Sequence, residues 1–175
     1  MSTPITHQRT IVSATATLPA LYRITLLYIE PLFALNGAFM VFFQPTKYAS
    51  LMTRGSAPYD AASQHLYTQV GGAWLYFAFI EAVVLRLHDD LCLWQLLCIG
   101  MLLSDVAYSW SVVQGLGGWE NWVKVGEWCL SDWTLLLSTV PLAVVRVLIL
   151  LEGHPETVKR RAEEKVNGQV DGKRK

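Results

Sequence analysis

The chain has 175 residues, of which 53% are hydrophobic, 11% are aromatic and only 16% are charged. Fourteen basic residues balance fourteen acidic ones, whereas a soluble domain carries roughly a quarter charged residues. This composition argues against an ordinary soluble domain and indicates an integral membrane protein in contact with the lipid bilayer. No nucleic-acid partner is expected, because the basic tail is short and interrupted by Glu163 and Glu164.

Four stretches are apolar enough to cross a bilayer, which takes about 20 residues per helix. They are predicted at 24–43, 66–85, 91–113 and 129–151. Residues 1–19 are polar and are expected to be a cytosolic lead, not a cleaved signal peptide, so the domain covers 20–152. Residues 153–175 are charged and are expected to form a disordered tail. The sequence therefore predicts an all-α, integral membrane four-helix bundle.

Basic residues near the span ends predict the orientation of the bundle. Seven of the fourteen Lys and Arg residues follow residue 158, which places the C-terminus in the cytosol. Four spans then put the N-terminus on the same side, although Lys47 and Arg54 in the 44–65 loop oppose this weakly. A basic cytosolic tail without a cleavable signal suggests the endoplasmic reticulum membrane.

Each predicted span carries an acidic side chain, which is costly in hydrocarbon. A rise of about 1.5 Å per residue puts Glu81 and Arg146 at about 9 and 8 Å from the cytosolic boundary, so they are expected to form a structural ion pair. Glu30, Asp105 and Asp132 come at about 15, 22 and 28 Å, where no cation is expected. Because three such acids cannot all ionise, at least one should hold a proton, as a general acid and base pair requires.

Polar neighbours of these acids are expected to complete a pocket. Tyr108 follows Asp105 by one helical turn, and Asn36 follows Glu30 by six residues. Four residues are assigned to substrate or water positioning: Asn36, Tyr108, Tyr76 and Gln69. Such residues also form helix-to-helix hydrogen bonds without any chemistry, and that alternative stays open. The histidines and cysteines lack metal-ligand spacing, so neither a metal nor another cofactor is predicted.

Three segments carry a resemblance to a known family. They are YIEPLFALNGAF at 28–39, LLSDVAYSWSV at 102–112, and GGWENWVKVGEW with LSDW within 117–133. Over about residues 20–152 the chain resembles small four-span membrane proteins of filamentous ascomycete fungi. Some of these belong to aurovertin- and citreoviridin-type polyketide pathways, in which a membrane hydrolase opens and cyclises epoxides. The resemblance implies an epoxide hydrolase/cyclase for a lipophilic polyketide epoxide in fungal secondary metabolite biosynthesis.

The predicted acids suit this chemistry. Opening an epoxide needs a proton for the leaving oxygen and a base that activates water or an internal hydroxyl. Glu30 and Asp105 are therefore predicted as the catalytic couple, with Asp132 as a third partner. Three rival functions use the same acids differently or not at all: a sterol- or terpenoid-type isomerase or cyclase that protonates an alkene, a small proton-coupled exporter, and a non-catalytic scaffold. A homodimer is compatible with so small a bundle.

Overall fold

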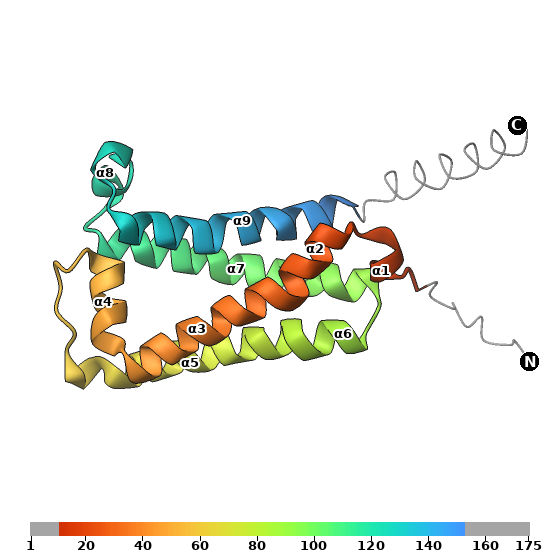
Figure 1. The fold of residues 1–175 in the computed structure, drawn as a ribbon, viewed down its shortest axis with the longest axis horizontal. Coiled ribbons are helices and arrows are strands. Elements are labelled where there is room, and N and C mark those ends of the chain that lie inside the picture. The colour runs from red at the N-terminus through yellow and green to blue at the C-terminus, as the bar shows by residue number, and fades with distance from the viewer. Residues whose placement is uncertain (1–10, 153–175) are drawn as a thin grey trace, which may run out of the picture.

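The computed structural model describes residues 11–152, and all regular secondary structure in that range is helical (Figure 1). It contains four rods long and apolar enough to cross a membrane: Ala20–Phe43, Ala61–Leu87, Leu91–Gly115 and Leu130–Glu152. The first three contain the predicted spans, and the fourth matches its predicted span to within one residue. The described residues thus form an all-helical bundle with four candidate membrane spans, and the predicted tail at 153–175 lies outside them.

The first two rods each contain a π-helical turn. The first rod consists of α2 (Ala20–Ile24), the π turn η1 (Thr25–Ile29) and α3 (Glu30–Phe43). The second consists of a 3₁₀ turn η2 (Ala61–Ser63), α5 (Gln64–Phe79), the π turn η3 (Ile80–Val84) and α6 (Leu85–Leu87). The other two rods are single helices, α7 (Leu91–Gly115) and α9 (Leu130–Glu152). Short π turns inside α-helices often mark functional sites.

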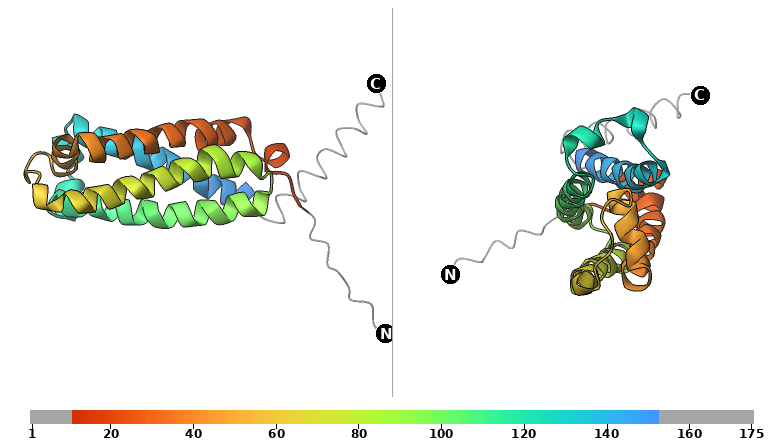
Figure 2. Two further views of the ribbon diagram at one scale, coloured as in Figure 1. Left: turned by 90° about the horizontal axis from the view of Figure 1, so that it is seen from below. Right: turned by 90° about the vertical axis from the view of Figure 1, so that its left-hand side faces the viewer.

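The rods pack as two layers of two helices, α3 with α5 and α7 with α9 (Figure 2). Small residues bring the first layer together: a Cβ added to Gly71 of α5 would lie 2.6 Å from the ring of Phe42 on α3. Gly37 of α3 similarly packs against the indole of Trp74 on α5. Close backbone approach through glycine is a usual way for helices to pack in lipid.

Short helices close the two ends of the bundle (Figure 1). At the end far from residues 11 and 152, α4 (Pro45–Thr53) packs against α3, α7 and α9. At the same end, α8 (Trp119–Trp122) and the 3₁₀ turn η4 (Val125–Glu127) connect α7 to α9. At the other end, α1 (Ala14–Thr17) lies on α7. The largest cluster of buried apolar residues lies near that end, and it includes Leu26, Trp94, Cys98 and Ile149.

The N-terminal segment differs from the prediction of a separate polar lead. Within residues 11–19, Ala14 and Leu18 are buried in the core. Asp89 anchors the segment by accepting hydrogen bonds from Ser13 Oγ at 2.6 Å and from the Thr15 backbone N–H at 2.7 Å. The apolar pattern here is a single pair spaced by four residues, too short to stand out from its polar surroundings. The domain therefore begins before residue 20, and residues 1–10 lie outside the described part.

Candidate functional site

A buried guanidinium on the fourth rod gathers one carboxyl group from each of the other three. Arg146 Nη2 donates to Glu30 Oε2 at 2.9 Å and to Glu81 Oε1 at 3.2 Å, and its Nη1 donates to Asp105 Oδ2. The side chains of Glu30 and Glu81 are each 1% exposed, whereas that of Asp105 is 20% exposed. We call these four residues the Arg146 cluster.

Both glutamates of the Arg146 cluster stand at the π turns. Glu30 directly follows η1 in the first rod, and Glu81 lies within η3 in the second, where the two turns pack against each other. A π turn adds a residue to the helical repeat and so redirects the side chains around it. Two irregular turns from different rods therefore meet at the point where two acidic side chains turn inward.

Pro31 adds a second irregularity beside Glu30. Proline has no N–H, so the Leu27 carbonyl four residues earlier loses its helical donor. Arg86 replaces that donor, because its Nη2 donates to Leu27 O at 2.6 Å. Its guanidinium also lies over the Tyr28 ring, 4.4 Å from the ring centroid. Arg86 thus connects the second rod to the first just outside the cluster. This contact helps to hold the two π turns next to each other.

The charges of the Arg146 cluster do not balance, since three carboxyl groups share one guanidinium. Glu30 Oε1 and Glu81 Oε2 accept no hydrogen bond from donors in the described part of the chain. The two glutamates are nevertheless neighbours, because Glu30 Oε2 and Glu81 Oε1 both accept from Arg146 Nη2. A hydrogen bond between carboxyl groups requires a proton on one of them. The cluster is therefore suited to hold a proton beside an ionised carboxylate.

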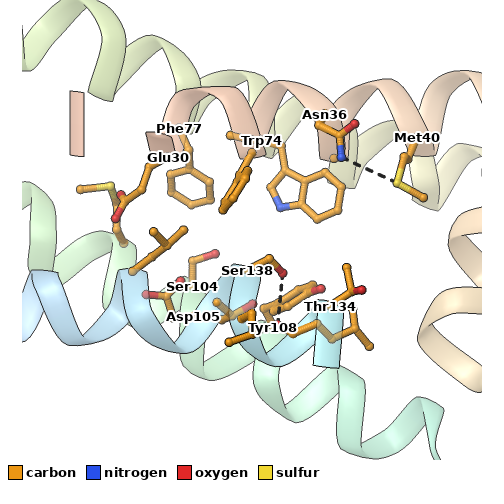
Figure 3. Close-up of a pocket in the computed structure, with 18 of the residues that line it drawn as sticks. Glu30, Asn36, Met40, Trp74, Phe77, Ser104, Asp105, Tyr108, Thr134 and Ser138 are labelled. Atoms are coloured by element: carbon orange, nitrogen blue, oxygen red, sulfur yellow. Dashed lines mark hydrogen bonds between the residues drawn. The ribbon is translucent and has the colours of Figure 1, made fainter. Parts of the chain in front are cut away.

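A cavity of about 400 Å³ lies between the two helix layers, with the Arg146 cluster in its wall (Figure 3). Trp74, Phe77 and Asn36 form one side, and Asp105 and Tyr108 face them from the other. Further hydroxyl groups line the cavity, from Tyr48, Ser104, Thr134, Ser138 and Thr139. Most of the remaining lining is apolar, so a lipophilic molecule with a polar group would match this space. Among residues 11–152, no group of His, Cys, Asp or Glu side chains is arranged to hold a metal ion.

The structure brings Glu30 and Asp105 together and contains the predicted contact between Glu81 and Arg146. The expectation that no cation reaches Glu30 or Asp105 is wrong. Gln95 Nε2 donates to Ile149 O at 3.2 Å, and from this register Asp105 and Arg146 are offset by about 10 Å along the bundle. Side chains lean toward the N-terminus of their helix, so on these antiparallel helices the two lean toward each other. The long arginine side chain then closes the gap.

Asp132 lies outside the Arg146 cluster and does not line the cavity, which corrects its predicted place beside Glu30 and Asp105. Arg54 Nε donates to both of its carboxylate oxygens at 3.0 Å. The Cys129 backbone N–H also donates to Asp132 Oδ2 at 2.8 Å. Arg54 ends α4 in a left-handed conformation with φ of 51°. Arg54 was predicted to lie in the loop at 44–65. Hydropathy gave no sign that α4 folds back over this end of the bundle and brings Arg54 to Asp132.

Of the four predicted positioning residues, Tyr108 and Asn36 line the cavity, whereas Tyr76 and Gln69 do not. Tyr76 is 59% exposed, and Gln69 is exposed as well. Helix α5 turns a different face toward the cavity. Trp74 and Phe77 lie on that face, and the sequence prediction did not include them. Both were detectable, because they precede Glu81 by seven and four residues and so share its side of the helix. Ser104, Thr134 and Ser138 gave no comparable signal.

Comparisons with known proteins place the chain in a family. A search of curated proteins and a search of solved structures each found no match to the chain. The sequence profile of the family described as a domain of unknown function, DUF7704, matches residues 15–154. That match runs from α1 through all four rods and includes every member of the Arg146 cluster. The chain therefore belongs to the DUF7704 family.

Proposed function

We propose that this protein is an intramembrane epoxide hydrolase/cyclase that acts on a lipophilic, polyketide-type epoxide. The observation that carries the proposal is the Arg146 cluster in the wall of a cavity of about 400 Å³. Three carboxyl groups on one guanidinium supply both an acid and a base. The apolar remainder of the cavity gives a lipophilic substrate room beside them.

Asp105 is the proposed base. It is the most exposed of the three acids, and Ser104 and Tyr108 line the cavity beside it. In the proposed reaction, its carboxylate takes a proton from water or from a hydroxyl of the substrate. The oxygen so activated attacks one epoxide carbon, and the bond between that carbon and the epoxide oxygen breaks.

Glu30 is the proposed acid. It lines the cavity and binds the same Arg146 nitrogen as Glu81, so the two neighbouring carboxyl groups can share a proton. Glu30 gives this proton to the departing epoxide oxygen, which becomes an alcohol. The proton gained by Asp105 then returns to the glutamate pair and restores the starting state. Arg146 contacts all three carboxyl groups and orients the acid and the base.

The test uses membranes that contain the wild type, Glu30→Gln or Asp105→Asn, incubated with lipophilic polyene epoxides in oxygen-18 water. Glu120→Gln is the matched control, because Glu120 is exposed on α8 and outside the cavity. We expect turnover to fall about 10²- to 10⁴-fold in the two cluster variants and to stay unchanged in the control. A labelled diol identifies hydrolysis, and an unlabelled cyclic ether identifies attack by an internal hydroxyl.

Other outcomes of the same assay identify the rivals. An unlabelled isomer formed while every epoxide persists would support alkene protonation by an isomerase or cyclase. Turnover equal to that of membranes without the protein would reject the hydrolase for these substrates. Proton-coupled export and a scaffold role would then be tested with the same variants, since export needs Glu30 whereas a scaffold needs neither Glu30 nor Asp105.

We further propose that both ends of the chain face the cytosol, from a place in the endoplasmic reticulum membrane. The basic residues after 158 support this orientation, and the described segment begins and ends at the same end of the bundle (Figure 1). Epitope tags at both termini of the protein in intact microsomes should be digested by added protease. Protection of both tags would reverse the orientation.

A further inference from the structure

The cavity is closed at the end where α4 lies. Tyr48 and Leu51 of α4 line it there, and the contact of Arg54 with Asp132 ties the end of α4 to α9. α4 also sits tightly on α7, since a Cβ added to Gly115 would lie 2.7 Å from the Met52 carbonyl oxygen. A substrate arriving from the aqueous side at this end would have to displace a packed helix.

The opposite end of the cavity is closed by the protein core. Beyond the Arg146 cluster, Leu26, Trp94, Cys98 and Ile149 are fully buried in one apolar cluster. Cys98 and Met101 of the same cluster lie on α7 between Trp94 and Asp105, and both are buried. Neither end of the bundle therefore offers a route from water to the acids.

The side of the cavity between α3 and α9 is different. Among the described residues that line the cavity, the exposed ones are all on these two helices: Phe33 and Asn36 on α3, and Thr134 and Leu137 on α9. Phe33 is 45% exposed and Leu137 is 59% exposed. The lining residues on α5 and α7 are half-buried or buried. Figure 1 shows why, because α3 and α9 diverge from the end where α2 lies toward α4.

This opening lies along membrane-spanning segments, so it faces hydrocarbon. Two of its four framing side chains, Phe33 and Leu137, are large and apolar and would contact lipid tails. The other two, Asn36 and Thr134, are polar. In the described part of the chain Asn36 makes only a weak contact with Met40 Sδ at 4.0 Å, so its amide can bind a polar group that passes inward.

We propose that substrate reaches the Arg146 cluster sideways from the bilayer through this opening, which we call the lateral portal. The proposal rests on the proposed function of the cavity and specifies its substrate class. The substrate is an amphiphile with a long apolar chain. Its reactive polar end binds at Arg146, while its chain stays in the portal against Phe33 and Leu137.

A blocking variant tests the portal through activity. Leu137→Trp places an indole in the opening, and Leu103→Trp is the matched control, because Leu103 is 70% exposed on α7 and does not line the cavity. We expect kcat/KM for a long-chain terminal epoxide to fall about tenfold or more in Leu137→Trp, with little change for a short-chain epoxide. Equal losses in the two variants, or equal losses for the two epoxides, would overturn the portal.

Photocrosslinking tests the portal without turnover and without a variant. The wild type in proteoliposomes is irradiated with a long-chain epoxide that carries a diazirine in the middle of its chain, and adducts are mapped by mass spectrometry. We expect adducts at Phe33 and Leu137 that excess unlabelled epoxide removes. Competed adducts on the outer faces of α5 or α7, or no competed adduct, would overturn the portal.

The two experiments separate failure of the portal from failure of the proposed function. Competed adducts at Phe33 and Leu137 without turnover would reject the epoxide hydrolase and keep the portal. The opposite result is turnover that is lost in Asp105→Asn but unchanged in Leu137→Trp, with no competed adduct on α3 or α9. It would support the epoxide hydrolase and reject the portal.

Discussion

Two arginines in this bundle bind different numbers of acidic side chains. Arg54 holds one carboxylate, with its Nε 3.0 Å from both oxygens of Asp132. Arg146 holds three carboxyl groups, from Glu30, Glu81 and Asp105. The first pair joins α4 to α9 outside the cavity, and the second set lies in the cavity wall.

The difference shows that charge balance separates structural acids from candidate catalytic ones better than burial does. Asp132 is fully buried, yet its one negative charge is matched by one positive charge and both of its oxygens are bonded. In the Arg146 cluster, two buried carboxyl oxygens have no hydrogen-bond donor among residues 11–152, and the carboxyl groups outnumber the cation. A balanced pair has no need of a proton, whereas burial of surplus carboxyl groups favours the uptake of one.

The largest effect should follow loss of the cation from the unbalanced site. Arg146→Met leaves three buried carboxyl groups without a positive charge, which should lower the free energy of unfolding by about 3–5 kcal/mol. The measurement is thermal unfolding in detergent. Changing Glu30, Glu81 and Asp105 to their amides in the same chain should recover part of this loss but no activity.

The balanced site supplies the comparison for that variant. Arg54→Met removes a cation whose side chain is 24% exposed, so water can partly solvate the remaining carboxylate. Its loss of stability should be smaller than that of Arg146→Met. An equal or larger loss in Arg54→Met would contradict the contrast between the two sites.

The next prediction separates catalysis from stability by changing one aspartate to asparagine at each of the two arginine sites. Asp105→Asn should reduce epoxide turnover about 10²- to 10⁴-fold while stability stays close to that of the wild type, because the cluster loses one surplus acid. Asp132→Asn should do the reverse, with a stability loss of about 1–3 kcal/mol and turnover per folded molecule largely kept. Turnover and unfolding are measured on the same purified samples. Loss of turnover in both variants would mean that Asp132 acts in the reaction after all.

A third effect concerns the helix layer that holds Glu30 against Glu81. A Cβ at Gly71 would lie 2.6 Å from the Phe42 ring, whereas one at the adjacent Gly72 would meet nothing within 4 Å. Gly71→Ala should therefore cost about 1–3 kcal/mol through overpacking. Gly72→Ala should be neutral or stabilising by up to about 1 kcal/mol, because alanine favours a helix more than glycine does. Similar unfolding temperatures for the two variants would show that α3 and α5 do not rely on this contact.

Hydropathy was enough to predict the four rods, because about 20 apolar residues per span leave a strong signal. The rule that an acid in a span needs a reason identified Glu30, Glu81 and Asp105 as notable residues. The contact of Glu81 with Arg146 also followed from counting residues along the helices. These features depend on local sequence or on distance along one axis, and both can be read from a linear chain.

The remaining features depend on rotation and on long-range packing. Arg54 and Asp132 are 78 residues apart, and only the folding back of α4 joins them. Tyr76 was assigned to the wrong face of the second rod, although the spacing from Glu81 was enough to indicate which face is buried. The π turns left no signal in hydropathy either, although they change the direction of the side chains at Glu30 and Glu81.

The smallest effect concerns Asp89, whose carboxylate accepts hydrogen bonds from uncharged groups of Ser13 and Thr15. Burial pushes the pKa of its carboxyl up, but hydrogen bonds from Ser13 and Thr15 outweigh this and hold the pKa below the usual 3.8. A lowered pKa stabilises the fold above about pH 3.8, and this contribution is lost as the pH falls through the folded value. Amide exchange of residues 13–18 should therefore be slower in the wild type than in Asp89→Asn at pH 6.

Below the folded pKa of Asp89 the two proteins should exchange these amides at the same rate, because the wild-type carboxyl is then neutral as well. A difference that persisted in strong acid would mean that the carboxyl acts through its shape and not through its charge. Amides in α4, which the Arg54–Asp132 pair ties to α9, provide the internal comparison. Their exchange should not depend on Asp89→Asn at any pH, since α1 and α4 lie at opposite ends of the bundle (Figure 1).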